Sequence, residues 1–191
     1  MIVEMDKLAT ELNYQPAFVT REKGEQAFAR LTAALADVPE EGSLILQFPA
    51  GQVMDVSFAD EAVIQLGQAI VDGKYGRRRL LLAELTQDSV DNINAAIRLQ
   101  RLKLAFLSIA PDGQWQVVGH LEDNLQETLT MVAKRPSLTA PELADELDLA
   151  LNSANNRLKR LYDLHLIQRE YEVSEKGLLY IYYFWQWEET D

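Results

Sequence analysis

The segment between positions 152 and 160 carries side chains that can read a nucleic acid. It holds three asparagines and three cations and no acidic residue: Asn152, Asn155, Asn156, Arg157, Lys159 and Arg160, with Ser153 among them. Asparagine can pair with adenine edges, and Arg or Lys can pair with guanine or hold a phosphate. Ala154, Leu158 and Leu161 recur at helical spacing, so we expect a helix that turns its amides and cations outward. Such a helix fits the DNA major groove, and a solvated polar surface is the alternative interpretation.

Two other groups of side chains could do chemistry earlier in the chain. Ser57 is expected to open a helix with Asp60 and Glu61 in its first turn. A serine there can act as a plain N-cap, at a helix end that favours negative charge. Basic residues gather in a loop and near a helix end, where they could form an anion patch or a rim of surface ion pairs. These residues are Lys74, Arg77, Arg78, Arg79, Arg98 and Arg101.

The sequence contains no recognisable catalytic motif. There is no cysteine, which excludes disulfides, thiolate nucleophiles and Cys-bound zinc. The two histidines, His120 and His165, cannot build a three-His metal site within one chain. A phosphate-cradling P-loop, a dinucleotide fingerprint and a nucleophile elbow are all missing. We therefore expect no catalytic residues, no metal and no cofactor, and an enzyme with an unrecognised site is only a third hypothesis.

Composition limits the partners of the chain. The 191 residues include 18 basic and 30 acidic side chains, which gives a formal net charge of −12. A body with that charge repels phosphates, so any DNA contact must come from a local basic patch. Hydrophobic residues make up 48% of the chain, enough to build a core. No apolar run approaches the roughly 18–20 residues of a membrane span, so we expect a cytoplasmic protein.

Apolar periodicity predicts alternating strands and helices before residue 121. Short strands are expected near residues 2–5 and 17–19, followed by helices that begin at Thr20 and at Ser57. Buried strands are expected at 44–48, 80–85 and 104–109, and a turn at Pro111-Asp112-Gly113 leads to a strand at 115–118. A further helix should precede residue 104, with Val90, Ile93 and Ile97 inward. This alternation predicts an α/β domain over residues 1–120.

The pattern changes after this point, and residues 121–191 are expected to form a second domain. A helix over 122–133 should precede a sharp helix start in which Thr139 and Glu142 form a capping box. A helix over about 151–164 and strands over 167–173 and 178–185 should complete it. The whole chain is then α+β, and the second domain has the element order of a winged helix-turn-helix.

Apolar and capping residues in this second part follow a spacing that extends over residues 138–183. They are Leu138, Thr139, Glu142, Leu143, Ala144, Leu147, Leu149, Leu158, Leu161, Leu166 and Ile167. In this spacing the segment resembles the winged-helix domain of ArsR- and MarR-like bacterial regulators. The resemblance implies that Asn152, Ser153, Asn155, Asn156 and Lys159 face the groove. It also implies that Arg169 and Lys176 lie on the wing, near phosphates.

Two motifs occur in order in the first part: Thr20-Arg21-Glu22 at one helix start and Ser57-Phe58-Ala59-Asp60-Glu61 at another. With the strand between them they resemble a STAS-like family of unknown function over about residues 15–110. The resemblance implies a small α/β module that works as a regulatory switch without catalysis. In the anti-sigma antagonists of this class a partner kinase phosphorylates a Ser or Thr at the start of the corresponding helix, and Ser57 is the nearest equivalent.

Aromatic residues crowd the C-terminal strand, over residues 180–187. Alternate residues of a strand face opposite sides, so one side can fill the core of the hairpin while the other needs cover. Tyr183, Trp185 and Trp187 are therefore expected in a domain or homodimer interface.

The sequence favours a non-enzymatic transcriptional regulator that binds double-stranded DNA as a homodimer and receives a signal from a protein or kinase through its first domain. The alternative is a protein-interaction adaptor whose winged helix docks a protein, which the acidic wing and Leu151 permit.

Overall fold

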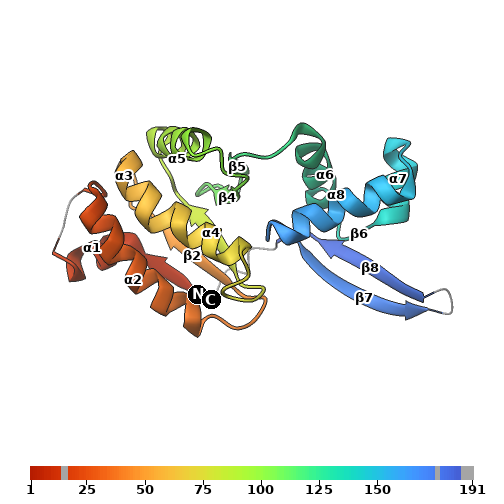
Figure 1. The fold of residues 1–191 in the computed structure, drawn as a ribbon, viewed down its shortest axis with the longest axis horizontal. Helices are drawn as coiled ribbons and strands as arrows, with labels where there is room; N and C mark the ends of the chain where they lie inside the picture. The colour runs from red at the N-terminus through yellow and green to blue at the C-terminus, as the bar shows by residue number, and fades with distance from the viewer. Residues whose placement is uncertain (14–16, 175–176, 186–191) are drawn as a thin grey trace. The chain divides into compact units, whose positions relative to one another are not determined.

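The computed structural model describes residues 1–13, 17–174 and 177–185 of the chain. The chain divides into two compact units, residues 1–120 and residues 121–191. Mixed helices and strands, one mixed sheet and one antiparallel sheet confirm the predicted α+β class (Figure 1). Within the described ranges, no helix combines the length and the apolar character that a membrane span requires.

A five-stranded sheet in the order β1-β2-β3-β4-β5 forms the centre of the first unit. The first four strands are parallel and the fifth is antiparallel to β4. The strands are β1 Ile2–Glu4, β2 Ser43–Gln47, β3 Arg79–Ala83, β4 Ala105–Ile109 and β5 Trp115–Gly119. Because the parallel strands follow one another in sequence order and such crossovers are right-handed, the connecting helices lie on one face of the sheet.

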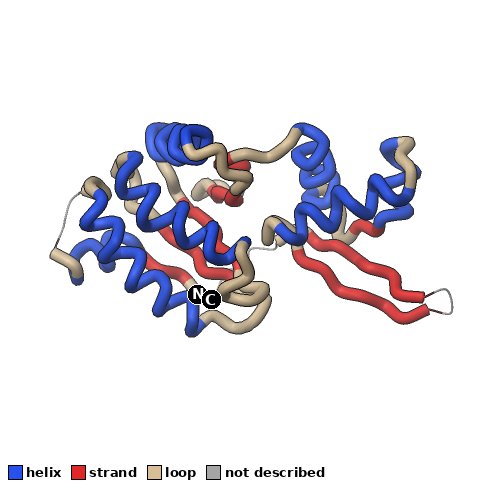
Figure 2. The backbone as a smooth tube through the Cα atoms, in the orientation of Figure 1, coloured by secondary structure: helices blue, strands red, loops and turns tan. Residues whose placement is uncertain are grey.

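The helices of this unit pack on that face (Figures 1 and 2). They are α1 Met5–Glu11, α2 Arg21–Asp37, α3 Val56–Phe58, the π-helical turn η1 Ala59–Ile64, α4 Gln65–Val71 and α5 Gln87–Leu99. Leu46, Leu82 and Phe106 of the sheet and Leu31 and Ile93 of the helices belong to one buried cluster. The helices thus cover the side chains that alternate toward them along each strand.

Three local expectations in this unit are wrong. Residues 5–11 form helix α1 where no helix was predicted. Residues 17–19 form no strand and make only a single bridge, between Phe18 and Met54. The helix expected to open at Ser57 is capped instead by Asp55, whose carboxylate accepts a hydrogen bond from the Phe58 N–H at 2.7 Å. Asp55 satisfies the free N–H, so Ser57 lies inside the first turn.

The second unit consists of three helices and a hairpin. Its elements are α6 Asp123–Ala133, β6 Leu138–Thr139, α7 Ala140–Leu147, α8 Leu151–Asp163, β7 Gln168–Ser174 and β8 Gly177–Tyr183. The strands form an antiparallel sheet in the order β6-β8-β7. The predicted capping box is confirmed at the start of α7, where Thr139 and Glu142 bond each other's backbone N–H groups. Leu129, Leu143, Leu158 and Tyr182 are buried at this unit's core.

Candidate nucleic-acid interface

Helix α8 has one buried and one exposed face. Ala154, Leu158 and Leu161 are each 0% exposed, and α8 packs on α6 and α7. The apolar spacing of three and four residues places these side chains on one side of the helix, where their burial fixes its orientation. The polar face is consequently directed away from the core of this unit.

The exposed face presents most of the residues predicted to contact DNA. Asn152, Ser153, Asn155, Asn156, Lys159 and Arg160 are all exposed. The first turn of α8 holds no acidic residue. Leu151 is also half exposed, at 50%, and adds an apolar group beside the amides. These side chains offer hydrogen-bond donors and acceptors at the spacing of one helix face, which base edges can meet.

The three cations of α8 play different roles. Arg157 turns toward α6, where its guanidinium lies 3.1 Å from a Glu127 carboxylate oxygen and donates to the Asn124 carbonyl at 3.5 Å. Only 19% of its side chain is exposed, so Arg157 holds two helices together and does not lie on the polar face. Lys159 pairs with Asp163 one turn away at 2.5 Å, but this exposed pair is weak and exchangeable. Arg160 makes no ion pair within the described part of the chain.

The base of the hairpin is fixed by Arg169. Its guanidinium lies 4.0 Å from the centre of the Tyr162 ring and 4.3 Å from that of Tyr180. This double cation–π contact ties β7 to α8 and β8, so the Arg169 guanidinium is engaged within the unit. Burial raises the pKa of Tyr182, an effect that the Arg169 hydrogen bond partly offsets. Lys176, the other cation predicted on the wing, lies outside the described residues.

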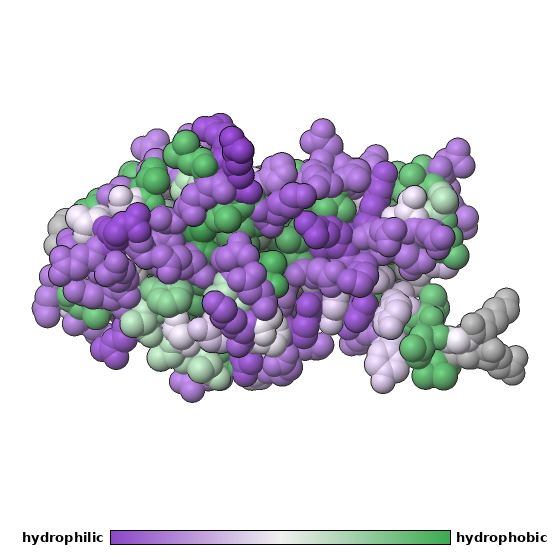
Figure 3. Space-filling model, viewed as in Figure 1, coloured by the Kyte–Doolittle hydropathy of each residue, from purple (hydrophilic) through white to green (hydrophobic). Residues whose placement is uncertain are grey.

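The outer part of the hairpin has an acidic face and an apolar face. Glu170 and Glu172 are exposed on one side. Tyr171, Val173 and Leu178 are 65%, 79% and 59% exposed on the other, and Val173 pairs directly with Leu178 across the strands. Figure 3 shows an apolar patch on this hairpin. The alternation of charged and apolar side chains over residues 169–173 is the sequence signal for this patch.

The aromatic residues predicted at an interface are only partly exposed. Tyr183 and Trp185 are half-buried, and the Tyr183 hydroxyl donates to Glu170 at 3.4 Å. Desolvation, followed by the Glu170 charge, raises the pKa of Tyr183. Trp187 lies outside the described residues.

In the first unit, the two motifs that begin α2 and α3 meet in one network of side chains. Arg21 pairs with Asp60 at 3.3 Å and also with the buried Glu61. Gln65 donates to Glu61, and Gln100 donates to Asp60 at 2.6 Å. The network joins α2, η1 and the residue that follows α5. Ser57 lies beside it, partly exposed.

The proposed anion patch is divided by internal contacts. Arg78 donates to the Val38 carbonyl at 2.6 Å and pairs with Glu40 at 3.2 Å. Arg79 is 6% exposed and donates to the Glu41 carbonyl, and Arg77 is half-buried. These three residues therefore hold the loop after α2, whereas Lys74 is exposed after α4. Arg98 is exposed in the last turn of α5, and Arg101 is exposed just after that helix.

No group of histidines and carboxylates among the described residues is arranged to hold a metal ion. Comparison with known protein families finds no family that matches the chain. Comparison with curated proteins also finds no match.

Proposed function

We propose that the chain is a non-enzymatic, DNA-binding transcriptional regulator whose second unit is a winged helix-turn-helix domain. The observation that carries this proposal is the outward face of α8, which presents Asn152, Ser153, Asn155, Asn156 and Arg160 without an acidic residue among them. In a chain with a net charge of −12, a helix face with only amides, a hydroxyl and cations is the surface best suited to a phosphate-lined groove.

The arrangement around α8 supports this function. Helix α8 rests on α6 and α7 through its apolar face, so the polar face can enter a groove without unfolding the unit. The hairpin follows α8 directly and is clamped to it by Arg169. A rigid helix beside a hairpin is the geometry in which the helix reads bases while the hairpin flanks the backbone.

The small number of free cations sets the strength of the expected binding. Lys159 and Arg160 are the exposed cations of the helix. With two phosphate contacts per chain, the slope of log K against log salt should be roughly −2, and roughly −4 for a homodimer on a two-fold symmetric site. Affinity should therefore be modest and should depend on symmetric binding by two copies.

We propose that the first unit is a STAS-like module that acts as a switch. It would receive a signal from a protein or accept a phosphate on Ser57. Ser57 is partly exposed and lies in the first turn of a helix, where N–H groups favour an added negative charge. The adjacent Asp55 cap and Asp60 would be repelled by that charge. Phosphorylation would thus disturb the Arg21 network instead of leaving the module unchanged.

The experiment that tests DNA binding is a fluorescence anisotropy titration of a random duplex with the full chain between about 50 and 200 mM salt. The variant K159A/R160A should lose most of its affinity and flatten the salt slope. The control variant K7A/K103A removes the same charge from exposed positions in the first unit and should bind as the parent does. Undetectable or salt-independent binding at low salt contradicts the proposal.

The exposed surface of the hairpin supports a second candidate function, which is the docking of another protein. Its apolar face, formed by Tyr171, Val173 and Leu178, is exposed, and its acidic face would repel DNA. If the chain is an adaptor, the variant V173S/L178S should lose its partner in a pull-down while K159A/R160A keeps it. A partner that V173S/L178S keeps and K159A/R160A loses contradicts docking on the hairpin.

A further inference from the structure

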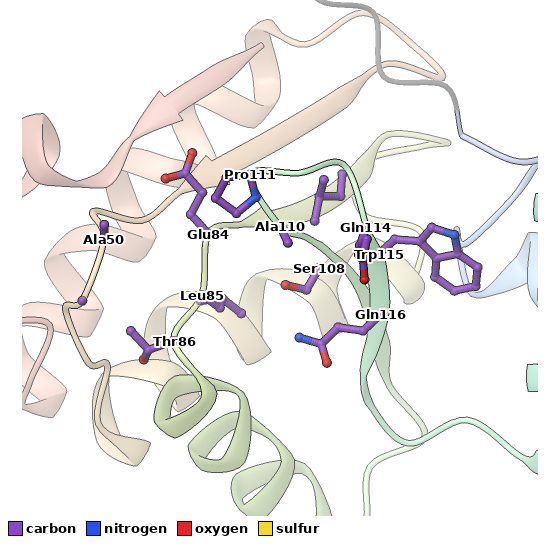
Figure 4. Close-up of a pocket in the computed structure, with 12 residues that line it drawn as sticks. Ala50, Glu84, Leu85, Thr86, Ser108, Ala110, Pro111, Gln114, Trp115 and Gln116 are labelled. Carbon is purple, nitrogen blue, oxygen red and sulfur yellow. The ribbon is translucent and has the colours of Figure 1, made fainter.

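A cavity of about 450 Å³ opens in the first unit at the carboxyl ends of β3 and β4 (Figure 4). Its walls come from three segments: residues 50–51 after β2, residues 84–86 between β3 and α5, and the ends of the β4–β5 hairpin. The parallel strands β3 and β4 bring the loops that follow them together at this edge of the sheet. The cavity lies within the usual size range of small-molecule sites.

Ser108 gives the cavity a buried polar group that has no protein partner. Its side chain is 3% exposed and lines the cavity, where it points toward Leu85 and Thr86. Within the described ranges, no residue donates to or accepts from its hydroxyl. Buried hydroxyls are nearly always hydrogen-bonded. Because this hydroxyl faces the cavity, its partner comes from the cavity, either as water or as a bound ligand.

Other polar groups surround the Ser108 hydroxyl. Gln116 pairs with Ser108 across β4 and β5, which places both side chains on the same side of the sheet. Thr86 caps α5 from the opposite wall, and its hydroxyl accepts a hydrogen bond from the Ser89 N–H at 3.2 Å. Gln116 is exposed and its amide can both donate and accept. A ligand in contact with Ser108 would therefore meet donors and acceptors on two sides.

The backbone at the mouth of the cavity is strained. Glu84 has a φ of 62°, a left-handed conformation that costs energy for a residue with a side chain. Its carboxylate accepts a hydrogen bond from the Gln47 amide at 2.7 Å and points away from Ser108 (Figure 4). The strained turn directs Leu85 and Thr86 to the cavity wall.

The lining offers no cationic side chain to an anionic ligand. Among the described residues that line the cavity there is no Lys, Arg or His, and Glu84 contributes a carboxylate. The chain as a whole carries a net charge of −12, which adds to the repulsion. Leu85, Ile109 and Pro111 supply apolar surface, on which a flat ring can rest. The complementary ligand is an uncharged ring compound that carries both donors and acceptors.

We propose that this cavity binds a neutral nucleoside, with Ser108 and Gln116 as the polar contacts. The proposal concerns only the first unit and does not depend on DNA binding by the second.

The test measures binding of adenosine and uridine to the full chain by calorimetry, with adenosine 5′-monophosphate as the charged comparator. At least one nucleoside should bind saturably with a dissociation constant below about 1 mM. The monophosphate should bind several-fold more weakly, because its charge meets no cation. Absence of saturable binding for both nucleosides overturns the proposal, and so does a monophosphate that binds as tightly as adenosine.

Variants separate this site from non-specific binding. S108A should weaken nucleoside binding about fivefold, and its melting temperature without ligand should not fall, since the hydroxyl has no protein partner to lose. Q116L, at an exposed position, should weaken binding in the same way. The control S153A removes an exposed hydroxyl from α8 and should bind as the parent does. Unchanged binding in both S108A and Q116L would show that the nucleoside occupies another place.

Discussion

At the scale of single residues, Asp148 shows how a strained backbone position can be recognised and tested. Asp148 ends α7 with a φ of 50°, in the left-handed region, and is exposed. Glycine adopts this conformation without penalty. We expect Asp148→Gly to raise the free energy of unfolding by about 1 kcal/mol, as measured by urea denaturation.

Asp145 provides the matched control for this prediction. It is exposed within the same helix, so Asp145→Gly removes the same charge but places glycine where the backbone is helical. That variant should be neutral or less stable than the parent. Equal stabilisation by both variants would mean that charge, and not backbone strain, is responsible.

The capping box at Thr139 gives a pH-dependent prediction at the same scale. Hydrogen bonds from the Thr139 hydroxyl and N–H lower the pKa of Glu142. A carboxyl with a lowered pKa in the folded state stabilises the fold above its unfolded pKa, and this contribution is lost as the pH falls through the folded pKa. We expect Thr139→Ala to cost about 1 kcal/mol at pH 7 and less at pH 3, in denaturant titrations at both values.

Thr130 serves as the control for the capping box. Its hydroxyl donates to the Gln126 carbonyl inside α6 and caps no helix end, so Thr130→Ala should leave the stability nearly unchanged at either pH. A similar loss in both variants would argue that the hydroxyl, and not the cap, matters.

At the scale of elements, the close approach of α4 to the sheet depends on Gly67. A Cβ atom at this position would come within 2.5 Å of the Phe106 Cζ atom, and Phe106 is buried. Although Ala favours helices over Gly, the overlap should dominate, and Gly67→Ala should cost about 1–2 kcal/mol. Thermal or urea unfolding measures this loss.

The double variant Gly67→Ala/Phe106→Leu tests the cause. A smaller side chain at 106 opens space for the added methyl group, so the double variant should lose less stability than the sum of the single variants. Additive losses would place the strain elsewhere.

The hairpin makes a second prediction at the scale of elements. Glu170 and Glu172 are exposed on β7, next to the helix that we propose for DNA binding. Replacing both with Gln removes a local repulsion of phosphates. The variant E170Q/E172Q should bind duplex DNA several-fold more tightly at low salt, and this gain should shrink as salt rises. A gain that persists at high salt, or a loss of affinity, contradicts a backbone contact by the hairpin.

At the scale of the whole molecule, repulsion between the net charges of two copies opposes self-association through the exposed apolar face of the hairpin. The chain carries a charge of −12 at pH 7 and has an isoelectric point near 4.6. Repulsion should keep copies apart at pH 7, and it disappears near pH 4.6. Light scattering at low salt should therefore show association near pH 4.6 that V173S/L178S reduces.

Leu99 supplies the control for that measurement, because it is 76% exposed on α5, in the first unit. If Leu99→Ser reduces association as much as V173S/L178S does, general surface hydrophobicity explains the association and the hairpin patch has no special part.

Local rules predicted much of the fold correctly. The Thr139 capping box, the helices α2, α5, α6 and α8 and the strand segments β2, β3, β4 and β5 depend on residues a few positions apart, and such patterns are visible in the sequence. Helix α1 was missed, and Asp55 took the capping role expected of Ser57.

At the candidate interface, too, local spacing predicted some features and long-range contacts decided others. Sequence periodicity correctly placed the amides on the exposed face of α8, because that face follows from the spacing of Ala154, Leu158 and Leu161. It could not show that Arg157 bonds Glu127, 30 positions away, or that Arg169 lies between two tyrosine rings. Whether a cation is free or engaged depends on partners that only folding brings near.

The sequence by itself determined the α+β class, the acidic charge and the outward polar face of α8, since composition and short-range spacing suffice for these. Only the tertiary structure decided which cations remain free, and only it revealed the unpaired Ser108 hydroxyl in a cavity built from three distant segments. The physical reason is that burial and hydrogen bonding are properties of neighbours in space, and neighbours in space are mostly distant in the sequence.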